Sequence, residues 1–147
     1  VKDYGRILAD DLEYADRAKT LSAKTYDVSE YLHQANLPLT AKQPSQAIAW
    51  HPPCSLQHGQ KITGVVEELL EGAGYNLVPV ADSHLCCGSA GTYSVLQYER
   101  SQALRQLKLD SLLEADPEVI VTANVGCQSH LAAGTSRPVL HWIEMLK

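Results

Sequence analysis

Between residues 47 and 140, short apolar segments alternate with segments whose apolar residues repeat at helical spacing. The short segments cover residues 47–51, 76–80, 118–122 and 138–140. Strands that alternate with amphipathic helices form βαβ units, whose strands run parallel. These segments also show little polar alternation, which is typical of a sheet covered on both faces. We therefore predict an α/β fold: a Rossmann-like, three-layer domain with a short, mostly parallel sheet of about four strands, preceded by an N-terminal helical segment.

Two of the helical patterns predict which side of each helix faces the core. The segment 62–73 carries apolar residues at i, i+3 and i+4 positions, and Gly72 and Gly74 end it. The segment from about 92 to 114 is predicted as one long helix. Its inward residues are expected to be Leu96, Ala103, Leu104 and Leu107.

The first part of the chain is predicted to be a separate helical segment. Asp27 followed by Glu30 has the pattern of a capping box, which predicts a helix start. Residues 38–45 include two prolines and several polar residues, as linkers do. The chain begins without Met and already in a helical pattern, as though in the middle of a longer protein. We predict that residues 1–44 are a helical linker from the preceding half of a parent protein, and that residues 45–147 are the cysteine-rich α/β domain.

Composition narrows the class of protein. A length of 147 residues, with 45% hydrophobic and 20% charged residues, fits one soluble globular domain. The net charge is −5 and no run of basic residues occurs, so nucleic acid is not an expected partner. No apolar run approaches the ~20 residues that a transmembrane helix needs. We therefore predict no transmembrane segment.

The positions of the cysteines give the strongest functional signal. The chain has four, and each follows a predicted strand: Cys54 the first, Cys86 and Cys87 the second, and Cys127 the third. The carboxyl ends of parallel strands meet at one edge of a sheet, where ligand sites form. We therefore expect the cysteines to meet in space. So few cysteines, two of them adjacent, do not suit a disulfide scaffold and favour metal or redox chemistry in a reducing compartment.

Residues around the cysteines support this interpretation. Each cysteine is expected near a helix start, where partial positive charge and free N–H groups stabilise thiolates. His130 follows Cys127 at the spacing of a C-x-x-C pair, and imidazole can replace thiolate as a ligand. A further set is predicted to support the ligands or the loops that carry them: His51, His84, Gly88 and Gly91.

The segments that carry these residues resemble a known family. HPPC at 51–54, HLCCGSAG at 84–91 and ANVGCQSH at 123–130 are similar to the CCG cysteine-rich domain. That domain occurs in heterodisulfide reductase, in lactate-utilisation proteins and in the iron–sulfur subunit of glycolate oxidase. DSHLCCGSAGTY and the closing HWIEMLK most resemble the C-terminal CCG domain of the glycolate oxidase iron–sulfur protein, and the resemblance covers nearly the whole chain.

The resemblance implies a ligand set and a cofactor. The ligands would be Cys54, Cys86, Cys87 and Cys127, with His130 in place of the last cysteine of the motif. The cofactor would be an iron–sulfur cluster, of the noncubane 4Fe–4S type if it follows heterodisulfide reductase, and Zn²⁺ is the alternative that some relatives hold. No catalytic residue is predicted.

The resemblance also implies a role in a larger complex. The domain would pass electrons from flavin-dependent glycolate oxidation to a membrane or quinone acceptor. Its partners would be flavin-containing glycolate-oxidising subunits and the rest of the same iron–sulfur subunit. The expected location is cytoplasmic, peripheral at the inner face of the cell membrane through these partners. The fragment is not expected to be catalytic alone, because it has no flavin or nucleotide fingerprint.

Two other functions stay open at this point. One is a structural module with a closed tetrahedral zinc site. The other is a thiol–disulfide domain, similar to heterodisulfide reductase, in which Cys86 or Cys87 acts as a nucleophile.

Overall fold

The computed structural model describes residues 1–147, which divide into two compact units, Val1–Leu37 and Pro38–Lys147. The first unit consists of the helices α1 (Tyr4–Ile7), α2 (Ala15–Ala23) and α3 (Val28–Ala35). The capping box predicted at Asp27 is confirmed: its side chain accepts a hydrogen bond from Ser29 N–H, and Glu30 accepts one from Asp27 N–H. The origin of this segment as a linker from a preceding half stays a prediction.

The second unit is built on a four-stranded, all-parallel sheet with the order β2-β1-β3-β4, which confirms the predicted fold class. The strands are β1 (Ala47–His51), β2 (Asn76–Leu77), β3 (Val119–Thr122) and β4 (Val139–His141). β2 is shorter than the predicted 76–80. Val78 N–H still donates to the Ile48 carbonyl at 3.0 Å, but Pro79 has no N–H with which to continue the ladder.

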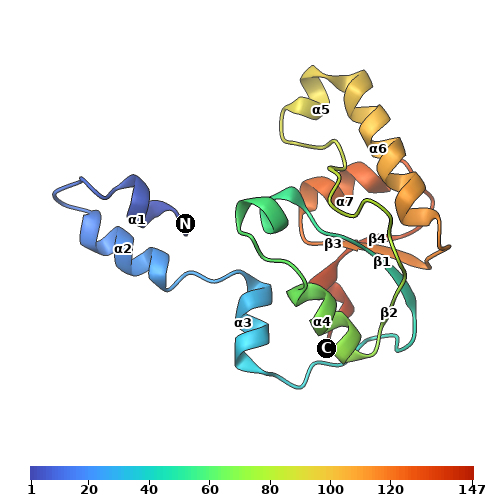
Figure 1. The fold of residues 1–147 in the computed structure, drawn as a ribbon, viewed down its shortest axis with the longest axis horizontal. Helices are drawn as coiled ribbons and strands as arrows, with labels where there is room; N and C mark the ends of the chain where they lie inside the picture. Colours follow the sequence, from blue (N-terminus) through green and yellow to red (C-terminus); the bar gives the residue numbers. More distant parts are fainter. The chain divides into compact units, whose positions relative to one another are not determined.

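Helices cover both faces of this sheet (Figure 1). α4 (Val65–Ala73) lies on one face, and α6 (Tyr98–Leu113) and α7 (Val125–Ala132) lie on the other. Right-handed crossovers explain this arrangement, because the chain moves outward from β1 to β2 and then back across β1 to β3 and β4. The remaining elements are α5 (Tyr93–Leu96), a π-helical turn η1 (Ser55–Gly59) and a 3₁₀ turn η2 (Trp142–Met145).

The core between the sheet and the α6–α7 layer includes two of the cysteines. Cys87 and Cys127 pack in one cluster with six apolar residues: Ala49, Leu109, Leu112, Ile120, Leu131 and Val139. Ile48, Val66 and Leu70 are buried as well. Every residue of β3 is buried, which is the expected state of a central strand covered on both sides.

The predicted helix 92–114 differs from the structure in two respects. It is broken at Gln97, where φ is −126° and ψ is 51°, so α5 and α6 are separate. The predicted inward face is also wrong: Leu96 and Leu107 are 74% and 59% exposed. The buried residues of α6 are Ser101, Lys108, Leu109 and Leu112. The pattern misleads because Lys108 lies on the inner side of α6, whereas Leu107 lies on its outer side.

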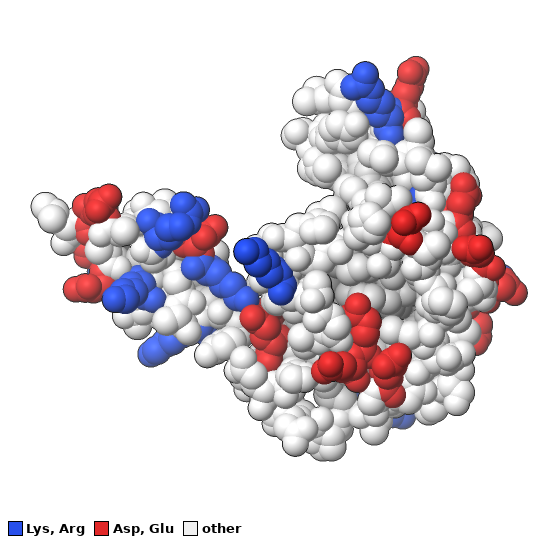
Figure 2. Space-filling view, viewed as in Figure 1, with Lys and Arg blue, Asp and Glu red and all other residues white.

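Charged side chains are spread over the surface. On the face seen in Figure 2, Asp and Glu gather over α4, whose sequence includes Glu67, Glu68 and Glu71, and Lys and Arg form no continuous basic surface there. None of the helices is long and apolar enough to span a membrane.

Shortening one buried and one exposed side chain of α6 tests the orientation of this helix. Leu112→Ala should reduce the free energy of unfolding by about 2–5 kcal/mol, because Leu112 is fully buried and its removal leaves a cavity. Leu107→Ala, the matched control in the same helix, should change it by less than about 1 kcal/mol. Chemical denaturation measures both. A larger loss of unfolding free energy in Leu107→Ala than in Leu112→Ala would support the inward face that the sequence pattern predicts.

Candidate metal centre

The candidate site lies where β1 and β3 end. From β1 the chain crosses to β2 on one side, and from β3 it crosses to β4 on the other. This reversal opens a crevice at the carboxyl ends of the two strands, which is the usual ligand site of an open parallel sheet. Cys54 follows β1 and Cys127 lies in the first turn of α7, directly after β3. Both line one cavity of about 500 Å³, together with Cys86.

Three side chains form the buried floor of this crevice. One side-chain donor atom each of His51, Cys87 and Cys127 lies within 4.8 Å of the other two, and all three residues are buried. His51 reaches this place because alternate residues of a strand share a face, and Ala49, two positions earlier, packs in the same cluster as both cysteines. Cysteines that follow separate strands therefore lie close together, as expected, and a histidine from β1 lies with them.

His51 is the least satisfied polar side chain of this floor. It is fully buried, and neither its Nδ1 nor its Nε2 makes a well-formed hydrogen bond, although the ring interacts with Cys87 and helps to lower the pKa of that thiol. Thr122, its register partner on β3, has a buried hydroxyl that is also unpartnered. Buried polar atoms are normally satisfied, because leaving one unpaired costs about 1–3 kcal/mol. A ring nitrogen that lacks a hydrogen bond and lies beside two sulfurs has the chemistry of a metal ligand, so these residues fit a metal or iron–sulfur group.

The cysteines differ in how readily they lose their protons. Cys127 S–H donates toward Cys87, which lowers the pKa of Cys87 below that of a free thiol and raises the pKa of Cys127. Burial raises the pKa of Cys54 to about 11, with a further contribution from Cys86. Without metal, Cys87 is therefore the thiol that loses its proton most readily, and Cys54 and Cys127 hold theirs more tightly than free thiols do.

The loop that carries Cys86 and Cys87 depends on Gly88. Its N–H donates to Cys86 Sγ at 3.3 Å, and its carbonyl accepts from Ser101 Oγ at 2.8 Å. Gly88 has φ +90°, and a Cβ there would lie 2.6 Å from the Ser101 carbonyl oxygen and 3.0 Å from Leu104 Cβ. Only glycine fits, because the loop backbone rests against the backbone of α6.

The loop, and not a helix, positions these two cysteines. The expectation that every cysteine lies near a helix start fails for Cys86 and Cys87, because the next helix, α5, begins only at Tyr93. Ser89 lies two residues after Cys87, and its hydroxyl is near the sulfurs of Cys87 and Cys127. Its Oγ is 3.5 Å from Cys87 Sγ and 4.0 Å from Cys127 Sγ.

Lys108 is a buried residue beside the site that the sequence pattern did not reveal. It is 1% exposed, and its Nζ donates to the Asp82 and Ser83 carbonyls at 3.0 and 2.9 Å. Burial lowers its pKa, while Asp82 and the cysteines act in the opposite direction. Through these two hydrogen bonds, Lys108 connects α6 to the segment that leads into Cys86 and Cys87. The one signal in the sequence was its i, i+4 spacing to both Leu104 and Leu112.

Asn124 is a second residue that sequence reasoning missed. Its side-chain oxygen caps α7 by accepting from the N–H groups of Gly126 and Cys127 at 2.9 and 3.3 Å. Its Nδ2 donates to Ser55 Oγ at 3.4 Å, which links the loops after β1 and β3. An Asn at a helix start is a recognisable N-cap signal, so this residue could have been found from the sequence.

The remaining predicted residues lie around the site. His130 Nε2 is 3.2 Å from Ser101 Oγ and 3.4 Å from the Ser101 carbonyl oxygen, so the ring faces α6, and it is not one of the three residues of the floor. His84 is exposed, and its carbonyl accepts from Gln57 Nε2 at 3.4 Å. Gly91 has φ +59° and open space around it.

Comparison with known proteins identifies a family whose model this chain matches. Residues 48–132 match the model of the CCG family, described as a cysteine-rich domain. The whole chain is 45% identical to the glycolate oxidase iron-sulfur subunit of Escherichia coli over 147 residues, which are 36% of that protein. Over 92% of its length it is 31% identical to the probable glycolate oxidase iron-sulfur subunit of Bacillus subtilis, and it covers 31% of that protein.

A second group of relatives carries another name. The chain is 30% identical to lactate utilization protein A of an Exiguobacterium species, over 99% of this chain and 62% of that protein. The chain therefore spans about a third of the length of the two glycolate oxidase subunits and somewhat less than two thirds of this second relative.

The thiol pKa values predict how metal uptake depends on pH. Cys54 and Cys127 have raised pKa values and hold protons at neutral pH, and a metal binds thiolates, so uptake must release these protons. Affinity for Zn²⁺, used as a probe, should rise with pH between about 6.5 and 8.5, by about tenfold per pH unit for each proton released. Calorimetric titration in buffers of different ionisation heat counts the protons. Affinity that is independent of pH would contradict the assigned protonation states.

Removing the Lys108 amine should loosen the cysteine loop. In Lys108→Met the Asp82 and Ser83 carbonyls lose their donor, so amides between residues 82 and 88 should exchange with deuterium faster than in the parent chain. Lys42→Met, at an exposed lysine, is the control and should leave these amides unchanged. Equal exchange in both variants would mean that Lys108 does not hold the loop.

Proposed function

The chain belongs to the CCG family of cysteine-rich domains, and we propose that it holds an iron–sulfur centre for electron transfer at the crevice where β1 and β3 end. One observation carries the proposal. The imidazole of His51 is buried without a hydrogen-bond partner, and one of its nitrogens lies within 4.8 Å of the sulfurs of Cys87 and Cys127.

The purely structural interpretation of these residues is weaker. A buried cysteine usually behaves as a small apolar side chain, and Cys87 and Cys127 do pack among leucines and isoleucine. That interpretation leaves both nitrogens of His51 unsatisfied, together with the hydroxyl of Thr122. A bound metal group would satisfy a ring nitrogen and bind both sulfurs, so it removes a cost that apolar packing leaves in place.

The proposed ligand set consists of the three residues of the buried floor and two further cysteines that line the cavity. Cys87, Cys127 and His51 form the floor, and Cys54 and Cys86 open onto the space above it. About 500 Å³ is far more than one metal ion needs, which favours a multi-atom cluster. For His130, the predicted ligand role requires its ring to turn away from Ser101, and it stays a prediction.

The residues of this chain would hold and tune the centre. When bound, an iron–sulfur group supplies reversible one-electron transfer. Burial of Cys87 and His51 keeps water from this side of the site. Gly88 N–H donates to a sulfur, and the Lys108 amine adds positive charge to the layer behind the cysteines. Both effects stabilise negative charge on thiolates, and they favour the reduced state of a centre bound there.

The relatives suggest where the electrons come from. The relatives named as glycolate oxidase iron-sulfur subunits support a place in a complex that oxidises glycolate, with flavin-containing subunits and the rest of the same iron–sulfur subunit as partners. We propose that the chain passes electrons from that oxidation toward a membrane or quinone acceptor. In this proposal the complex is cytoplasmic and peripheral at the inner face of the cell membrane.

A structural Zn²⁺ site is the second candidate. His51, Cys87 and Cys127 are mutually close and buried, and one more thiol would complete a tetrahedral set. The thiol–disulfide alternative is less well supported at Cys87, whereas Cys86 lines the cavity and stays a candidate nucleophile. Cys87 has the lowered pKa that a nucleophile needs, but it is 0% exposed, so a substrate disulfide cannot reach it.

Metal and sulfide analysis of protein prepared without oxygen separates these functions. We expect iron with acid-labile sulfide and broad visible absorption. Cys87→Ser and His51→Ala should lose most of the iron while circular dichroism stays close to that of the parent chain, because each removes one donor of the buried floor. His84→Ala, at an exposed residue of the same loop, is the matched control and should keep its iron.

Other results would overturn parts of this proposal. Colourless protein with one equivalent of zinc would establish the structural module. Iron retained in Cys87→Ser would remove the site from this crevice. A loss of iron in His130→Ala but not in His51→Ala would assign the imidazole ligand to His130.

A further inference from the structure

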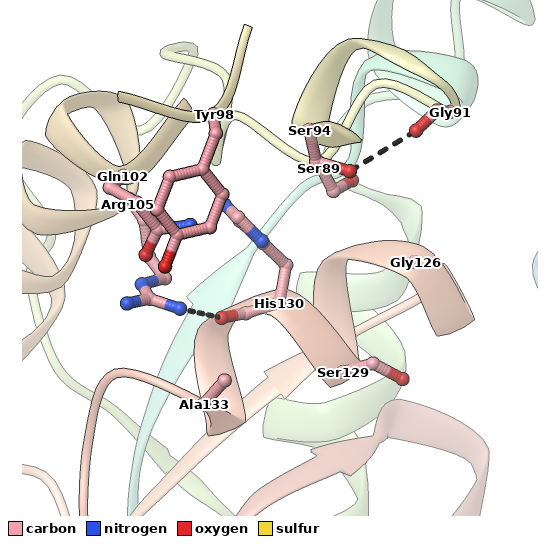
Figure 3. A pocket seen from close by; sticks show the side chains of 10 residues that line it. All are labelled: Ser89, Gly91, Ser94, Tyr98, Gln102, Arg105, Gly126, Ser129, His130 and Ala133. Carbon is pink, nitrogen blue, oxygen red and sulfur yellow. Dashed lines mark hydrogen bonds between the residues drawn. The ribbon is translucent and has the colours of Figure 1, made fainter. Parts of the chain in front are cut away.

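His130 makes its side-chain hydrogen bonds with α6 and not with the buried floor. Figure 3 shows its side chain on α7, pointing toward the part of α6 that carries Tyr98, Gln102 and Arg105. The Nε2 atom of His130 lies 3.2 Å from Ser101 Oγ and 3.4 Å from the Ser101 carbonyl oxygen. Ser101 is fully buried, so these contacts are shielded from water. The imidazole is therefore held by one residue of α6.

The contacts with Ser101 determine which ring nitrogen of His130 carries a proton. Ser101 Oγ lies 2.8 Å from the Gly88 carbonyl oxygen, and a carbonyl can only accept, so the hydroxyl donates its one hydrogen there. The hydroxyl oxygen must then accept from His130 Nε2. The Ser101 carbonyl oxygen, the second neighbour of Nε2, can also only accept. Both contacts assign a proton to Nε2, and a nitrogen that bears a proton is not free to bind a metal.

The peptide between Gly88 and Ser89 connects this hydrogen bond to the cysteines. The Gly88 carbonyl and the Ser89 N–H belong to the same trans peptide group, so they point to opposite sides. The Gly88 N–H, in the peptide before it, donates to Cys86 Sγ at 3.3 Å. The Ser89 N–H interacts with Cys87, whose pKa is lowered mainly by Cys127 and further by this N–H. Two successive N–H groups thus act on two sulfurs, an arrangement that stabilises negative charge.

Packing of α7 against α6 is the simpler interpretation of the His130 contact. Arg105, one turn after Ser101 on α6, already donates to the His130 carbonyl at 3.4 Å and joins the two helices (Figure 3). Packing alone does not explain why the Ser101 hydroxyl points at the Gly88 carbonyl, which lies in the cysteine loop and in neither helix. Hydrogen bonds in such a chain polarise one another, so the proton on Nε2 strengthens the bond from Ser101 to the loop.

We propose that His130 is a positioning residue of the cysteine loop and not a metal ligand. It acts through Ser101, whose hydroxyl fixes the Gly88 carbonyl and thereby the direction of the N–H groups beside it. An N–H group that faces a sulfur favours the reduced state of a bound iron–sulfur group, so His130 raises the reduction potential. Its effect on a centre rests on the proposed function. The ligand role predicted for His130 would require a nitrogen near the sulfurs, and neither of its nitrogens belongs to the group of mutually close donor atoms.

The reduction potential of the iron-loaded protein tests this role. Ser101→Ala and His130→Leu each remove one donor of the chain of hydrogen bonds. At a fixed potential, the ratio of reduced to oxidised centre should therefore fall by about two- to fivefold, with unchanged iron content. His130→Gln places an amide N–H near the position of Nε2 and should restore the parent potential. Ser129→Ala, at an exposed serine beside His130, is the matched control and should also keep the parent potential. Iron lost from His130→Leu, or a parent potential in either His130→Leu or Ser101→Ala, would overturn the proposal.

Nuclear magnetic resonance of the metal-free chain keeps this test separate from the proposed function. The ring nitrogen shifts of His130 should show a proton on Nε2. The Ser89 amide proton should move upfield in Ser101→Ala and in His130→Leu, because its peptide is then less polarised, and it should stay at the parent position in His130→Gln. A proton on Nδ1 alone, or an unmoved Ser89 amide, would overturn the positioning role even in protein that binds iron. A chain without iron that shows both expected signals would support the positioning role and overturn only the electron-transfer function.

Discussion

The connections that leave β1 and β3 run toward opposite edges of the sheet, and this is the constraint on which the rest of the structure depends. In a parallel sheet whose order is β2-β1-β3-β4, the chain leaves the two central strands toward opposite edges, which opens a crevice beyond their carboxyl ends. Chain segments that are far apart in the sequence meet in that space. The loop after β2 brings Cys86 and Cys87 to it from the α6 side, and Ser101 and Lys108 hold that loop in place.

The core of this domain contains polar side chains on the α6–α7 side of the sheet, where apolar side chains would be expected. His51, Thr122 and Lys108 are all buried in or beside the layer that contains Cys87 and Cys127. Lys108 is satisfied by two carbonyls, whereas neither ring nitrogen of His51 makes a well-formed hydrogen bond, although the ring interacts with Cys87. Unsatisfied buried polar groups reduce the stability of the metal-free chain without unfolding it, so metal binding should raise the stability of this side of the sheet.

Local patterns predicted the features that depend on neighbouring residues. The strand Ala47–His51 and the capping box at Asp27 were found with their observed positions, because each rests on a short run of sequence. The gathering of cysteines at strand ends followed from topology. The orientation of α6 did not, because Leu107 is exposed and Lys108 is buried, and periodicity assigns them the other way.

The contact between Gly88 and α6 also determines how this loop can evolve. A side chain at position 88 would collide with the carbonyl oxygen of Ser101, and a backbone atom cannot turn aside as a rotamer can. A compensating change elsewhere would have to displace the whole helix, so the position should admit no replacement during divergence. Gly91 has positive φ but open surroundings, so asparagine, which tolerates that conformation, can replace it there. Two glycines of one loop are thus under unequal selective pressure, one from steric collision and the other from backbone conformation alone.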